Sequence, residues 1–198
     1  MSSPTASSTS STTSPSTTST DRTRRAFRLD EAVPILARTP ATLDALLRGL
    51  PEGWTNAHEG GETWSPFDVL GHLIHCENAD WVLRARIILE HGESRTFDPF
   101  DRLAQFKESQ GKTVDGMLDE FAALRAENLR TLAAMNLTDA DLDRRGRHPA
   151  FGEVALGQLL ATWTAHDLGH IAQIVRSMAK QYTDAVGPWE QYLSILRR

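Results

Sequence analysis

Four long stretches of this chain place apolar residues three or four positions apart, which is the spacing of one face of an α-helix. Polar or Gly/Pro-rich segments separate the stretches, which cover residues 29–49, 65–92, 113–135 and 156–182. No segment shows the strict alternation of apolar and polar residues that a half-buried strand would show. A helix with one apolar face must bury that face, so the sequence predicts an all-α fold, a four-helix bundle.

The ends of two stretches carry recognisable signals. Ser65 suits a helix N-cap and Pro66 its first turn, while Gly92 follows the last apolar position, so one continuous helix is expected between them. Pro34 and Pro40 fall inside the first stretch, and its regular part could therefore begin as late as Pro40.

The chain divides into a tail and one domain. Sixteen of the first twenty residues are Ser or Thr, and such a segment cannot bury enough apolar surface to offset the entropy of ordering it. Residues 1–24 are therefore expected to be a disordered tail. Residues 25–198 are expected to form a single helical domain, which ends in a short extra helix over residues 189–196.

Charge and cysteine content argue against some classes of partner. The 198-residue chain has a formal net charge of −5 with its Lys and Arg scattered, so it offers no basic stripe for nucleic acid. No apolar run approaches the roughly 20 residues that span a bilayer, which argues against a membrane protein. The single cysteine, Cys76, excludes an internal disulfide and agrees with a cytoplasmic location. A solvated loop is expected for the run Arg144, Arg145 and Arg147.

Three histidines fall on the apolar faces of two predicted helices. His166 and His170 lie one turn apart on the same face of the last helix, and at about 100° per residue both fall within its apolar stripe. His72 falls in the same way on the second helix. Neutral imidazoles bind zinc and similar ions, and three of them leave one coordination position open. These residues therefore favour a divalent metal site, although ordinary hydrogen-bonded core histidines remain the alternative.

Two neighbours of the histidine pair are candidates to support it. Asp167 lies in the apolar stripe, where its carboxylate needs either a ligand imidazole or an arginine of a neighbouring helix as partner. Gln173 lies one turn past His170 and could orient a bound water or cap a buried backbone group. His75 is expected at the edge of the apolar stripe and Cys76 as a small core residue. Loop or surface positions are expected for the remaining histidines, His58, His91 and His148.

Two motifs of the chain resemble the DinB-like superfamily, which is unrelated to the translesion polymerase of the same name. One is Trp64-Ser65-Pro66 followed by Val69-Leu70-Gly71-His72-Leu73, Glu77 and Trp81; the other is His166-Asp167-Leu168-Gly169-His170-Ile171-Ala172-Gln173. The resemblance covers nearly everything after residue 25. It implies a four-helix bundle with up-down-down-up connectivity and a divalent metal, commonly zinc or nickel. By resemblance its three ligands fall on His72, His166 and His170.

The resemblance leaves the reaction open, because members include transferases and isomerases that use low-molecular-weight thiols as well as metal-dependent hydrolases. We expect an enzyme whose metal activates a thiol or water for attack on a small electrophilic substrate. The alternative is a non-catalytic, metal-stabilised helical module for binding or dimerisation, in which the tryptophans are packing anchors. A homodimer is compatible with either. A metalloprotease built on His166-Asp167-x-x-His170 and Glu190 is disfavoured, because Asp167 falls in the apolar stripe.

Overall fold

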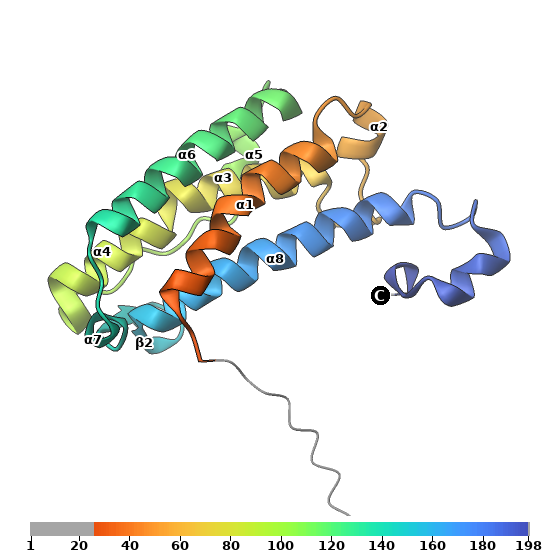
Figure 1. The fold of residues 1–198 in the computed structure, drawn as a ribbon. Coiled ribbons are helices and arrows are strands. Elements are labelled where there is room, and N and C mark those ends of the chain that lie inside the picture. The colour runs from red at the N-terminus through yellow and green to blue at the C-terminus, as the bar shows by residue number, and fades with distance from the viewer. Residues whose placement is uncertain (1–25, 198) are drawn as a thin grey trace, which may run out of the picture.

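Four helical segments form the body of the protein in a computed structural model, which describes residues 26–197 (Figure 1). They are α1 (Leu29–Leu47), the pair α3 (Pro66–Ala79) and α4 (Trp81–His91), α6 (Val114–Ala134) and α8 (Leu156–Lys180). Shorter helices lie in the connections, namely α2 (Glu52–Thr55), α5 (Ala104–Glu108) and α7 (Asp139–Leu142). The predicted all-α four-helix bundle is confirmed. The predicted tail, residues 1–24, lies outside the described residues.

The bundle has up-down-down-up connectivity. Both α1 and α3 pack against α6 and α8, so the consecutive helices α1 and α3 lie on a diagonal. Arg48 at the end of α1 pairs with Asp119 near the start of α6, which makes these two helices antiparallel. The long connection over residues 92–113 returns the chain to the beginning of α3, and α6 therefore runs parallel to α3 (Figure 1). This arrangement places α3 directly beside α8, the two helices that carry the candidate ligands.

The N-terminus of α3 forms as its sequence predicts. The Ser65 hydroxyl accepts a hydrogen bond from the Asp68 amide at 3.2 Å, and the Asp68 carboxylate accepts one from the Ser65 amide at 3.0 Å. This capping box satisfies two amide groups that a helix start otherwise leaves unpaired. It fixes where α3 begins, and therefore which of its residues face the bundle interior.

Helix α1 begins at Leu29 and continues through both prolines, rather than starting near Pro40. Pro40 has no amide hydrogen, so the carbonyl of Leu36 has no partner within the helix. Arg125 of α6 donates to this carbonyl from Nη1 at 2.8 Å. A tertiary contact thus satisfies the group that the proline leaves free.

The expected continuous helix over residues 65–92 is broken at Asp80, whose backbone angles are φ −121° and ψ −85°. No proline or glycine marks this position, which is why helical periodicity did not reveal it. The Asp80 side chain makes no capping hydrogen bond; its Oδ1 lies 3.0 Å from Nη1 of Arg84. The break places both residues on the wall of the cavity described below.

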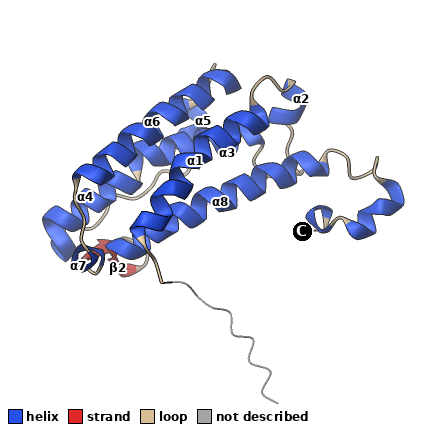
Figure 2. Ribbon diagram, viewed as in Figure 1, coloured by secondary structure: helices blue, strands red, loops and turns tan. Residues whose placement is uncertain are grey.

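The bundle also carries a small hairpin, which the sequence did not predict. Strands β1 (Arg145–His148) and β2 (Gly152–Ala155) pair antiparallel, with Arg145 opposite Ala155, beside the start of α8 (Figure 2). Strands of four residues are too short to show a clear period. Arg144, Arg145 and Arg147 are exposed as expected, but the last two lie on a strand instead of a loop.

The C-terminal segment differs from a regular helix. It forms two 3-10 turns, Gly187–Tyr192 and Ser194–Leu196. Leu196, the last residue of the second turn, is buried. Trp189 is 68% exposed, so it is not the packing anchor expected, whereas Trp163 and Trp81 are buried in the core. None of the described helices is both long and apolar enough to cross a membrane.

Gly146→Ala is expected to destabilise the protein by about 1–3 kcal/mol, because the added methyl overpacks the core. Its Cβ would lie 2.6 Å from Cγ1 of Ile88, a fully buried side chain with restricted rotamers. Gly169→Ala is the matched control: its Cβ meets nothing within 4 Å on α8, so the change should stabilise the helix by up to about 1 kcal/mol. Urea denaturation followed by circular dichroism measures both; equal effects would contradict the packing argument.

Candidate metal centre

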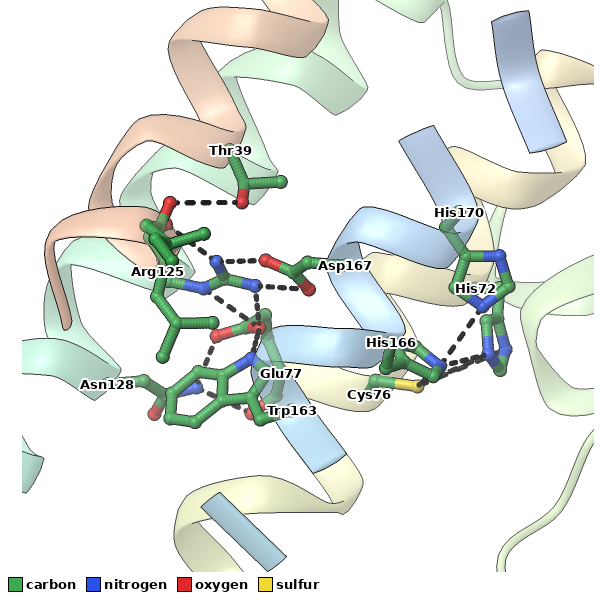
Figure 3. A network of polar contacts seen from close by, with 12 residues as sticks. Thr39, His72, Cys76, Glu77, Arg125, Asn128, Trp163, His166, Asp167 and His170 are labelled. Atoms are coloured by element: carbon green, nitrogen blue, oxygen red, sulfur yellow. Dashed lines mark hydrogen bonds and ion pairs between the residues drawn. The ribbon is translucent and has the colours of Figure 1, made fainter. Parts of the chain in front are cut away.

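Three imidazoles converge between α3 and α8. Nε2 of His166 lies 3.1 Å from Nε2 of His72 and 3.1 Å from Nε2 of His170. The nitrogen atoms that the three residues offer all lie within 4.8 Å of one another. His166 and His170 reach this point from successive turns of α8, and His72 from the facing helix (Figure 3). The sequence placed these residues on interior faces, and the structure brings them together.

The surroundings keep all three rings neutral. Burial, together with the neighbouring histidines, lowers the pKa of His72 to about 4 and that of His166 to about 3. Burial also lowers the pKa of His170. Because only a neutral imidazole has a nitrogen lone pair to offer, this environment suits metal binding near neutral pH.

Two glutamines fix which nitrogen of each ring carries its hydrogen. Gln105 is buried, and its amide nitrogen lies 3.5 Å from the carbonyl oxygen of Asp68, so its Oε1 faces His72. His72 Nδ1–H donates to that oxygen at 2.8 Å, and His170 Nδ1–H donates to Oε1 of Gln173 at 2.9 Å. Both rings therefore present the lone pair of Nε2 to the common point. Gln173, expected to orient a bound water or to cap a backbone group, instead contacts the candidate ligand His170 directly.

This arrangement fits a divalent cation. Because His72 and His170 carry their ring hydrogens on Nδ1, only His166 can carry a hydrogen on Nε2. At most one hydrogen is therefore available for hydrogen bonds among the three Nε2 atoms. His166 Nδ1 is buried without a hydrogen-bond partner among the described residues. A tetrahedral ion with bonds of 2.0–2.1 Å separates its nitrogen ligands by roughly 3.3 Å, close to the spacing observed. Three protein ligands leave one position for another molecule.

A cavity of about 910 Å³ adjoins the histidines. The walls come from α3, α4, α8, the segments before α3 and after α4, and the β1–β2 hairpin, and they carry the aromatic side chains Trp64, Trp81, Phe97, Phe100 and Phe151. Cys76 also lines it, with Sγ 3.5 Å from Nε2 of His72, and burial raises the pKa of its thiol. The cavity is large enough for a small organic molecule beside the histidines.

Asp167 has the second of its two expected partners, an arginine of a neighbouring helix. Arg125 Nη1 donates to Oδ2 of Asp167 at 2.6 Å, and Nη2 donates to Oε1 of Glu77 at 2.7 Å. Trp163 and Asn128 also donate to the Glu77 carboxylate. His166 and Asp167 point to opposite sides of α8 (Figure 3). The ion network therefore lies behind the histidines and outside the cavity.

Sequence reasoning missed several residues around the site. Gln105 lies on the short helix α5, and no pattern in the sequence connects it to His72. His75, expected at the edge of the stripe, is only 7% exposed, and its Nδ1 lies 3.0 Å from Glu108. His148, expected as a surface or loop residue, ends β1 half-buried and lines the cavity. Each of these positions depends on a segment folding back over the bundle.

The fold and the histidine cluster define a helical-bundle protein with a site suited to a divalent metal. Residues 35–174 match the family model of the DinB superfamily, and the chain belongs to this superfamily. The structure is similar to that of YfiT from Bacillus subtilis, described as a probable metal-dependent hydrolase with an unusual four-helix bundle topology. The TM-score is 0.68 at 21% identity, covering 80% of this chain and 91% of YfiT. No curated protein matches the sequence.

Proposed function

We propose that the chain is a metal-dependent enzyme in which His72, His166 and His170 hold one divalent ion, zinc or nickel. The observation that carries the proposal is the convergence of three neutral Nε2 atoms on one point beside a cavity. The proposed reaction is attack by water or a small thiol on an electrophilic group of a small molecule. The description of YfiT as a probable metal-dependent hydrolase supports the choice of water.

Each part of the site has a role in this proposal. The bound ion would supply Lewis acidity and lower the pKa of a water or thiol that reaches it. Gln105 and Gln173 hold His72 and His170 in the tautomer that offers Nε2 to the ion. The aromatic walls exclude bulk water and hold the apolar part of a substrate. Three ligands and an adjoining cavity favour catalysis over the metal-stabilised module, because structural zinc sites normally have four protein ligands.

Elemental analysis of the purified full chain tests the proposed site. We expect about one zinc or nickel ion per chain in the wild type and none in the triple variant His72→Ala, His166→Ala, His170→Ala. A panel of small esters and amides, with and without added thiol, should be turned over by the loaded wild type and by neither the chelated protein nor the variant. Equal metal content in the wild type and the variant would refute the proposed ligand set. Equal turnover by the loaded wild type, the chelated protein and the variant would refute the proposal that the chain is a metal-dependent enzyme.

Gln105→Leu is expected to weaken metal affinity by about 10–100-fold, because it removes the acceptor that orients His72. Gln105→Glu, which keeps an acceptor oxygen near His72 Nδ1, should retain most of the affinity. Competition with a chromophoric chelator measures both variants, and thermal melting confirms that they are folded. Equal affinities for the leucine variant and the wild type would show that the hydrogen bond does not support the site.

A further inference from the structure

The cavity extends from the histidines along α4 to Arg84. The Arg84 side chain is 9% exposed and lines the cavity wall. Its guanidinium carbon lies 5.2 Å from the centre of the Phe97 ring, and Nη1 lies 3.0 Å from Oδ1 of Asp80. Among residues 26–197 no further acceptor approaches this guanidinium within hydrogen-bonding distance. Its remaining N–H groups are therefore left to the cavity.

Arg125 shows how the same protein satisfies a buried guanidinium. It donates to two carboxylates, those of Glu77 and Asp167, and to the carbonyl of Leu36. Arg84 has only the Asp80 carboxylate, through one nitrogen. No nitrogen of Arg84 is among the fully buried polar atoms that lack a partner in the described residues, so its remaining N–H groups are open to the cavity. They can therefore donate to an acceptor that arrives through the cavity, and a charged donor makes the stronger hydrogen bond.

His148 adds a second donor beside the Phe97 ring that Arg84 contacts. Its Nδ1 accepts hydrogen bonds from the backbone amides of Ala150 at 3.0 Å and Phe151 at 3.2 Å, so Nε2 carries the ring hydrogen. The His148 ring packs edge-on against Phe97, with centroids 6.0 Å apart, and lines the same cavity. Arg84 and His148 thus contact one aromatic ring, and both bring donors to this end of the cavity.

We propose that Arg84 and His148 bind a carboxylate group of the substrate, at the end of the cavity remote from the histidines. A planar guanidinium fork matches a carboxylate, and Asp80 already offsets one positive charge, which disfavours a dianion such as phosphate. Twelve residues and the break at Asp80 separate Arg84 from His72, which is a rise of at most roughly 18 Å. The substrate class is therefore an elongated organic acid with an apolar or aromatic middle. Calling this ligand a substrate rests on the proposed function; the binding site itself does not.

Isothermal titration calorimetry on the full chain, kept metal-free with a chelator, tests the site with phenylbutyrate and its neutral partner phenylbutanol. We expect the wild type to bind the acid at least about tenfold more tightly than the alcohol. The double variant Asp80→Asn, Arg84→Met should lose this preference; both are changed because Arg84→Met alone leaves a buried carboxylate without its partner. Arg86→Met, an exposed arginine on the same helix, should keep it.

His148→Phe gives an independent test, since it leaves the Asp80–Arg84 pair in place and preserves an aromatic ring against Phe97. It should reduce the preference for the acid several-fold, and it decides the matter if the double variant does not fold. The proposal is overturned if the wild type binds acid and alcohol equally or binds neither, or if the preference survives in the folded double variant. Because no metal is present, these outcomes are independent of those that decide the metal site.

Discussion

Replacing Arg125 with methionine is expected to lower the free energy of unfolding by about 3–5 kcal/mol, because it leaves two buried carboxylates without a cation. The side chains of Glu77 and Asp167 are both 0% exposed. Burial would lower the pKa of Arg125, but these two carboxylates raise it overall, so the guanidinium stays charged. The substitution also removes the donor that satisfies the Leu36 carbonyl above Pro40.

Urea denaturation followed by circular dichroism measures this loss. Arg130→Met is the control on the same helix, because Arg130 pairs with Glu127 on an exposed surface, where ion pairs contribute little. Adding Glu77→Gln and Asp167→Asn to the Arg125 variant should recover part of the stability, since uncharged amides cost less to bury than carboxylates. A loss below about 1 kcal/mol for Arg125→Met would contradict the assignment of the network as a structural element.

The position of the network gives the same variant a second expected effect. Glu77 follows Cys76 on α3 and Asp167 follows His166 on α8, so Arg125 joins the two helices directly behind the histidines (Figure 3). Loosening this junction should also weaken metal affinity. The structure thus separates two tasks between adjacent residues of each helix: one side chain faces the cavity, and the next holds the helices together.

Removing the metal is expected to cause the second large loss of stability. Chelation is expected to lower the melting temperature of the wild type and to leave that of His166→Ala unchanged, because only a protein that binds the ion loses stability with it. The difference should reach about 4 kcal/mol when free metal exceeds its dissociation constant a thousandfold. His166 is the most informative ligand to remove, since its Nε2 lies 3.1 Å from both of the others.

Differential scanning calorimetry at matched metal concentrations measures this effect. His91→Ala is the control, because His91 ends α4 with an exposed side chain and takes no part in the cluster. That variant should respond to chelation as the wild type does. If chelation shifted His166→Ala and the wild type equally, the stabilising ion would have to be bound elsewhere.

Local features of the sequence could be interpreted because their causes lie within a few residues. The capping box at Ser65 needs only Asp68 three positions later. The shared face of His166 and His170 needs only helical geometry. The break at Asp80 and the β1–β2 hairpin escaped the same reasoning, because neither has a decisive local signal: no glycine or proline stands at the break, and each strand has four residues.

The sequence by itself determined the helices, their apolar faces and the inward direction of the three histidines, because helical periodicity is a property of neighbouring residues. Only the tertiary structure decided what those side chains meet. Asp167 pairs with Arg125 of α6, and His72 is hydrogen-bonded to Gln105 of α5. Arg84 and His148 contact one shared neighbour, the Phe97 ring. Partners of this kind come from segments far apart in the chain, and their pairing follows from how the helices and connections pack, which no local pattern records.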